Sequence, residues 1–174
     1  AMPEGRFEIE VTAQDTLTKT GKDELAFLFT ANLGEPIRPL LKVASGGELS
    51  RVALAIKTVL LNASGVPTIV FDEIDTGVGG VTAQKMAEKI AVIAKVGQVL
   101  CITHLPQIAS FADRHLLIRK ESTGGRTSTG LTVLDEEGRI QELMRMTVGD
   151  NVSEVAYANA KELLAAAAKN KQAR

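Results

Sequence analysis

The chain opens with two stretches in which apolar and polar residues alternate, at residues 6–12 and 24–31. A period of two is typical of a strand with one buried face. The polar segment 14–23 lies between them. We therefore predict two antiparallel strands joined through that segment, followed by a proline-bearing loop over residues 34–39.

A helix is predicted to begin near residue 45. Ser45-Gly46-Gly47-Glu48 has the Ser-x-x-Glu spacing of a capping box. Apolar residues then recur at helical spacing, which predicts the buried face of this helix. These positions are Leu49, Val52, Ala53, Ile56 and Leu60.

The period changes after this helix. Residues 67–71 and 98–103 are short β-prone runs, predicted as strands buried on both faces. Between them, Met86, Ile90 and Ile93 mark a helix. This order predicts a βαβ unit, hence a parallel pair of strands with a right-handed crossover.

The rest of the chain adds antiparallel strands and helices to one domain of residues 1–174. Residues 114–119 predict a third strand, which a Gly124-Gly125 turn joins to residues 127–134 as a hairpin or edge pair. Two helices follow, over residues 139–146 and an alanine-rich 153–169.

Composition narrows the class of protein. Of the 174 residues, 45% are hydrophobic and 24% charged, which is ordinary for a soluble globular domain. We find no apolar run of the roughly 18–20 residues that a membrane span needs, so no membrane partner is expected. A formal net charge of -1 lacks the footprint of an autonomous DNA-binding domain. A single cysteine, Cys101, excludes an internal disulfide framework and fits a reducing compartment.

Candidate chemistry lies where the two predicted parallel strands end, because ligands of open α/β sheets bind beyond the carboxyl ends of the strands. Asp72 and Glu73 follow the first strand. One carboxylate can hold a hydrated Mg²⁺ while the other polarises an attacking water. His104 follows the second strand at the same rim and can hydrogen-bond a developing phosphoryl charge. The alternatives are a charged turn and a loop histidine.

The start of the first helix offers an anion site. Ser45, Gly46 and Gly47 provide backbone N–H groups, a hydroxyl and the positive end of a helix dipole. The alternative is that Ser45 only caps the helix, and both roles are compatible because Glu48 completes the capping box.

One expected motif is absent from the sequence. Phosphate-loop ATPases carry Gly-x-x-x-x-Gly-Lys-Ser/Thr. Around Gly21-Lys22, Thr16 replaces the first glycine and Asp23 the hydroxyl residue. Metal and catalytic groups without a phosphate cradle make an incomplete enzyme.

Together these motifs resemble those of the ABC ATPases, in the family's order. Residues 44–51 resemble the ABC signature, residues 68–73 the Walker B strand and residues 74–77 the D-loop, and His104 falls at the switch-histidine position. The finer resemblance is to the RecN family of SMC-like bacterial DNA repair proteins. It covers nearly the whole chain, through Ala160-Lys161-Glu162-Leu163-Leu164.

The resemblance implies a fold. The chain resembles the carboxy-terminal half of an ABC/SMC-type ATPase head, with a mostly parallel sheet flanked by helices and extra antiparallel strands. In that family a long coiled coil interrupts the head, and the amino-terminal half carries the Walker A loop. The missing phosphate loop is then expected, and this chain alone is expected to be inactive.

The resemblance also implies roles. Asp72 would help position Mg²⁺, Glu73 would be the general base, and His104 would contact the γ-phosphate of ATP. Asp75 would help couple two sites. The groups that would contact ATP held by an opposing head are Ser45, Gly46 and Gly47, with Glu48 beside them. Partners would be the amino-terminal half, a second head and, through the full-length protein, DNA. The setting would be double-strand break repair in the nucleoid-associated cytoplasm.

Several readings remain open at this point. An assembly module that uses ATP as a clamp between heads, another SMC-type head and a transporter nucleotide-binding domain are the alternatives. Cys101 is interpreted as core rather than as a nucleophile, and His115 as a surface or strand-end histidine. Arg51 would contact nucleotide or the partner head, or be solvated.

Overall fold

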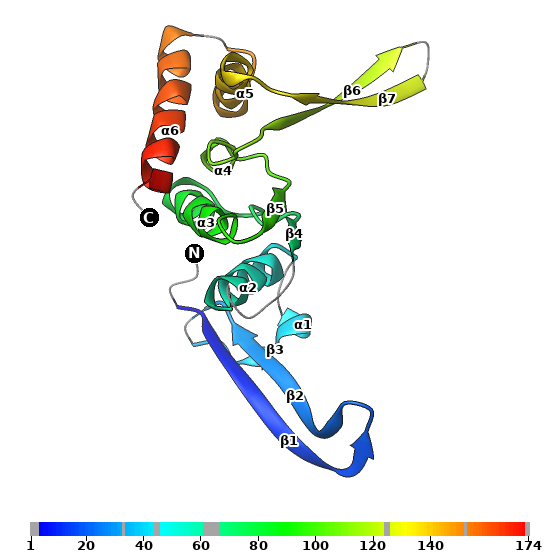
Figure 1. Ribbon diagram of the computed structural model, residues 1–174. Helices are drawn as coiled ribbons and strands as arrows, with labels where there is room; N and C mark the ends of the chain where they lie inside the picture. Colours follow the sequence, from blue (N-terminus) through cyan, green and yellow to red (C-terminus); the bar gives the residue numbers. More distant parts are fainter. Residues whose placement is uncertain are drawn as a thin grey trace.

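A computed structural model describes residues 4–32, 34–43, 46–60, 67–123, 126–151 and 153–172. The strands are β1 (Arg6–Thr18), β2 (Gly21–Thr30), β3 (Arg38–Pro39), β4 (Thr68–Phe71), β5 (Gln98–Cys101), β6 (Leu116–Thr123) and β7 (Arg126–Val133). The helices are α1 (Leu40–Val43), α2 (Gly46–Val59), α3 (Gly80–Ile93), α4 (Pro106–Ala109), α5 (Glu136–Val148) and α6 (Glu154–Gln172). Figure 1 shows two hairpins, β1–β2 and β6–β7, projecting from opposite ends of the molecule, with β4, β5 and α3 between them.

The predicted antiparallel pair at the start of the chain is confirmed, but its strands are longer than predicted. The segment 14–23, predicted to separate the strands, mostly extends them, with a register shift between Ala13 and Thr18. Polar cross-strand contacts make this possible, such as the 2.6 Å hydrogen bond from Gln14 Nε2 to Glu24 Oε2. The predicted proline loop also contains β3, which pairs with β2.

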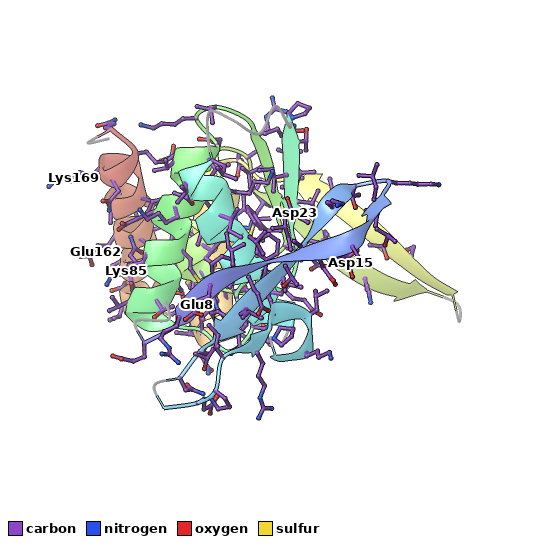
Figure 2. The ribbon with its side chains drawn as sticks, turned by 90° about the horizontal axis from the view of Figure 1, so that it is seen from below. Glu8, Asp15, Asp23, Lys85, Glu162 and Lys169 are labelled. Carbon is purple, nitrogen blue, oxygen red and sulfur yellow. The ribbon has the colours of Figure 1, made fainter. Side chains whose placement is uncertain are left out.

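The β1–β2 hairpin has an apolar face that is mostly open. At its base Phe29 is buried against Leu40 and Val52. Further out, the same face carries exposed apolar side chains with exposed fractions of 40–61%. They are Phe7, Ile9, Val11, Leu25 and Phe27. Figure 2 labels three acidic side chains, Glu8, Asp15 and Asp23, along this hairpin.

The predicted βαβ unit is confirmed and holds the central core. β4 and β5 pair in parallel, with Phe71 opposite Cys101. The helix α3 connects them and packs Met86, Ile90 and Ile93 into a cluster with Phe71 and Ile108. All three of the helix positions predicted from the sequence are buried.

The prediction that β4 and β5 are buried on both faces is wrong for this chain. Ile69 and Phe71 face the core, whereas Val70 is 60% exposed. On the neighbouring strand and just beyond it, Leu100 is 45% and Ile102 is 56% exposed. Helix α3 covers one face of the pair, and these apolar residues remain open on the other.

The predicted buried face of α2 is only partly correct. Val52 is buried as predicted, but Ala53 is exposed and Leu54 is buried instead. Leu49 and Leu60 are 36% and 46% exposed. The reason is that α2 packs in two directions: Val52 joins the cluster at the hairpin base, and Leu54 joins the central cluster.

The carboxy-terminal elements match the prediction. β6 and β7 form an antiparallel hairpin, with Leu116 opposite Val133, while the predicted Gly124-Gly125 turn lies outside the described residues. The Asp135 side chain caps α5 by accepting a 2.8 Å hydrogen bond from Gly138 N. Helices α5 and α6 then pack through Leu143, Ala156 and Ala160.

The α/β class is confirmed. In the described residues the parallel part of the fold is the β4–β5 pair, and the other five strands pair antiparallel in two separate sheets. No helix in the described ranges is both long enough and apolar enough to cross a membrane.

Candidate functional site

The candidate site lies at the carboxyl ends of β4 and β5. The parallel register places Phe71 opposite Cys101, and one more hydrogen bond, Ile102 N to Phe71 O at 2.9 Å, extends the pairing. The residues that follow each strand therefore leave the sheet at the same rim. Asp72 and Glu73 are exposed there, and the His104 side chain is 70% exposed.

Glu73 has an unusual backbone. Its φ is 55°, and among the described residues it is the non-glycine residue with a positive φ. A side chain in this left-handed region costs about 1–2 kcal/mol. Such strain persists where the surrounding structure over-determines it, and it gathers at functional sites. Here Phe71 and Ile74 on either side are buried at 4% and 0% exposure, which fixes the turn.

Asp75 lies in the interior of the loop after β4. Its side chain is 3% exposed, and one oxygen, Oδ2, accepts hydrogen bonds from Thr103 Oγ1 at 2.6 Å and His104 N at 2.9 Å. The same oxygen is 3.1 Å from His104 Nδ1. The carboxylate thus joins the loop after β4 to the segment after β5.

The first turns of α2 dock on the same loop. Ser50 Oγ donates to Asp72 O at 3.3 Å, and Arg51 Nη1 donates to Thr76 O at 2.9 Å. Gly47 is buried, and a Cβ at this position would lie 3.1 Å from both Thr76 O and Arg51 Nη1. A side chain here would force the helix or the loop to shift by a few tenths of an ångström, so glycine favours this close approach.

Of the other residues predicted to form the anion site, the structure describes Gly46 and Glu48 but not Ser45. Gly46 is the first residue of α2 and Glu48 lies half-buried in its first turn. Ser45, the predicted cap and phosphate ligand, lies outside the described residues. The structure thus brings Gly47 to the loop that carries Asp72 and Glu73, with Gly46 and Glu48 in the same first turn of α2.

Cys101 and His115 are both partly buried, and Cys101 packs against the central core. Burial, together with the negative charges of Asp75 and Asp72, raises the pKa of the Cys101 thiol to about 12. This excludes a thiolate nucleophile near neutral pH. His115 directly precedes β6, as the strand-end interpretation predicted, and it is half-buried rather than on the surface. Its pKa is lowered by burial and by the nearby Arg139.

The donor set at the rim suits a loosely held divalent cation. No cluster of three metal-ligating side chains occurs among the residues that the structure describes. Mg²⁺ keeps several waters and takes one or two carboxylates plus substrate phosphates. Exposed Asp72 and Glu73 fit that requirement, whereas a closed metal cage does not exist in the described ranges.

Three contacts at the site were not predicted from the sequence. The sequence motifs predict no role for Thr103 or Ser50, and they are compatible with three roles for Arg51: contact with nucleotide, contact with the partner head, or solvation. All three belong to the segments that carry the motifs, but no spacing rule pairs them with their partners, because the pairing depends on how α2 and the two loops meet in space.

No family model matches this chain. Individual proteins do. It is 51% identical over 148 residues to the DNA repair protein RecN of Bacillus subtilis, which covers 85% of this chain and 26% of that protein. It is 46% identical over 161 residues to RecN of Halalkalibacterium halodurans, which covers 92% of this chain and 28% of that protein. By sequence, this chain matches a segment of the RecN proteins. The matched part spans less than a third of these relatives.

The chain has a fold similar to that of an SMC head. It superposes on the Smc head domain from Pyrococcus yayanosii with a TM-score of 0.60 at 20% identity, over 84% of this chain and 26% of that one. A second structure comes from work on the ATP-driven dimerization and DNA-stimulated activation of SMC ATPases. This chain superposes on it with a TM-score of 0.50 at 20% identity, over 81% of both chains. At these identities the comparison establishes the fold. The expected head fold is confirmed by this comparison, and the expected resemblance to RecN is confirmed by the sequence matches.

Proposed function

We propose that this chain supplies the metal-binding, base and switch groups of an SMC-like ATPase that acts in the repair of DNA double-strand breaks. The observation that carries the proposal is the shared rim: β4 and β5 pair in parallel and deliver Asp72, Glu73 and His104 to one edge. The curated RecN relatives are DNA repair proteins, which supports the biological setting.

Each group has a role that its environment permits. Exposed Asp72 would hold a hydrated Mg²⁺, which when bound to ATP neutralises charge on the phosphates. Glu73 would accept a proton from the attacking water, and its strained, fixed backbone orients the carboxylate. His104 would contact the terminal phosphate. Positioning and electrostatics supply most of the rate in such reactions, so each group alone achieves little.

The chain needs a second segment of the same protein to bind ATP. No phosphate loop is present in its sequence. The open faces of its sheets support the same conclusion, because Val70, Leu100 and Ile102 expose apolar surface beside the rim. Exposed apolar faces of this kind mark contact surfaces. We assign this face to the amino-terminal half of the head.

A second head is the other proposed partner. The signature residues Gly46, Gly47 and Glu48 begin α2 beside the rim, and the SMC neighbour is described as dimerizing in an ATP-driven manner. Ser45, Gly46 and Gly47 would then contact ATP held by the opposing head. Because the net charge of this chain is -1, we assign DNA contact to other parts of the full-length protein. We place that protein in the nucleoid-associated cytoplasm.

Reconstitution tests this proposal. The chain alone should hydrolyse ATP at background rates, and addition of the RecN segment that carries the phosphate loop should restore turnover. Restored turnover should disappear with Glu73→Gln, an isosteric change that removes the base. The matched control is Glu137→Gln, an exposed carboxylate on α5. Turnover by the chain alone, or restored turnover that survives Glu73→Gln, would contradict the proposal.

An ATP-dependent clamp with little turnover is the second candidate. The description of the SMC neighbour, with dimerization driven by ATP, favours it. Sedimentation of the reconstituted Glu73→Gln head distinguishes the two: a clamp gives a stable dimer with ATP, and its wild-type form shows little hydrolysis.

A further inference from the structure

Asp75 is a buried carboxylate that contacts the segment carrying His104. Its side chain is 3% exposed, so the charge is removed from water. A buried charge is tolerated when it is paired and hydrogen-bonded. Here Thr103 Oγ1, His104 N and His104 Nδ1 approach the same oxygen at 2.6, 2.9 and 3.1 Å. All three come from two consecutive residues.

These contacts fix both the backbone and the ring of His104. The bond to His104 N holds the main chain, and the contact at Nδ1 limits rotation of the ring. Thr103 Oγ1 also accepts a 3.0 Å hydrogen bond from Leu105 N, so the loop folds around the Thr103–Asp75 pair. The histidine side chain stays 70% exposed, which leaves Nε2 as the nitrogen for a ligand.

The two nitrogens of the His104 ring have different surroundings in this arrangement. A carboxylate 3.1 Å from Nδ1 leaves Nε2 as the nitrogen on the far side of the ring, and an Nε2–H group donates a hydrogen bond to an anionic acceptor. A carboxylate at Nδ1 holds the ring orientation. Such a ring suits an anionic acceptor at the rim.

We propose that Asp75 is a positioning residue for His104, holding the ring so that Nε2 meets a phosphate oxygen of the bound nucleotide. This rests on the proposed function, because it requires His104 to contact nucleotide. It differs from the role in coupling two heads that the family resemblance implies for Asp75, because the contacts described here lie within one chain.

A double-mutant cycle in the full-length RecN protein tests the proposal. Steady-state ATP turnover is measured for the wild type, Asp75→Asn, His104→Ala and the double variant. Removing a partner that orients a functional histidine typically costs about 10- to 100-fold, so Asp75→Asn should lower kcat by about that factor. KM for ATP should stay within about twofold, because a misplaced ring mainly weakens the contact to charge that develops on the phosphate in the transition state.

The decisive comparison is made without His104. If Asp75 acts through that ring, Asp75→Asn should lower turnover by less than about twofold in the His104→Ala background. A merely structural role would lower turnover equally in both backgrounds. The matched control is Glu142→Gln, which also alters a buried carboxylate, at 6% exposure and paired with Arg145. It should leave kcat unchanged.

Independent, multiplying losses, or a wild-type kcat for Asp75→Asn, would overturn the proposal while leaving the ATPase assignment intact. Absence of turnover in the wild type would refute the proposed function and this inference with it. If thermal unfolding shows that Asp75→Asn does not fold, Thr103→Val takes its place in the cycle. It removes one donor to Asp75 Oδ2, and its loss of kcat should likewise vanish without His104; a loss that persists there would overturn the proposal.

Discussion

Because Glu73 has a left-handed backbone, we predict that glycine at this position gives a more stable protein than alanine, the reverse of the usual order. At φ 55° a side chain costs about 1–2 kcal/mol, and glycine removes that cost. Glycine also adds freedom to the unfolded chain, which costs about 0.4–1 kcal/mol. The difference predicts that Glu73→Gly is more stable than Glu73→Ala by about 0.5–1 kcal/mol. Both variants lack the carboxylate, so both should be inactive in the full-length protein.

Urea unfolding of the 174-residue chain measures this difference through the midpoint, provided that the slopes agree. The matched control is the same pair of substitutions at Lys85, an exposed position inside α3 that Figure 2 labels. There the glycine variant should be about 1 kcal/mol less stable than the alanine variant. If glycine destabilises position 73 as it does position 85, the strain assigned to Glu73 is refuted.

Three further predictions concern the core. With a thiol pKa raised to about 12 by burial and by the negative charges of Asp75 and Asp72, Cys101 should resist a thiolate-directed reagent at pH 8 until urea unfolds the chain. Rapid labelling of the folded chain would contradict this. Burial and Arg139 lower the pKa of His115 below 6.5, so its contribution to stability is complete above pH 6.5 and is lost as pH falls toward the lower folded value. His115→Gln should flatten the fall of the urea midpoint between about pH 7.5 and 5, and an unchanged fall would exclude His115 as its source. Leu143→Ala, at 0% exposure, should cost about 3 kcal/mol, whereas Leu131→Ala, at 61%, should cost less than about 0.5. Equal losses would contradict the packing of α5 on α6.

Local pattern predicted the elements of this chain well where one physical cause dominates. Helix α3 follows from its apolar spacing, and the parallel β4–β5 pair from the strand–helix–strand order. The hairpin β1–β2 was predicted too short because polar cross-strand pairs extend it, and these leave no apolar alternation to detect.

Burial was harder to predict because it depends on neighbours. Val70 lies in an apolar run typical of a strand covered on both faces, yet it is 60% exposed in this chain. Leu54 is buried in place of Ala53 because α2 meets two clusters at once. The local sequence indicates whether a side chain tends to be buried, but it does not show which other segment is present to cover that side chain.

The candidate site divides in the same way. Asp72, Glu73 and His104 were predicted from their positions after strands, and the structure brings those strand ends together. The buried contacts of Asp75 and the docking of Arg51 on Thr76 were not predicted, because they arise between segments about 25 residues or more apart. The catalytic roles themselves remain predictions.

The central claim is that Glu73 is the base of an ATPase completed by the rest of the RecN protein, and one measurement tests it most directly. Single-turnover hydrolysis of ATP is followed in the full-length protein with Glu73→Gln, beside ATP binding by the same variant. We predict that hydrolysis falls by at least about 100-fold, the scale of a positioned general base, while binding is retained. Hydrolysis at the wild-type rate by Glu73→Gln would contradict the account.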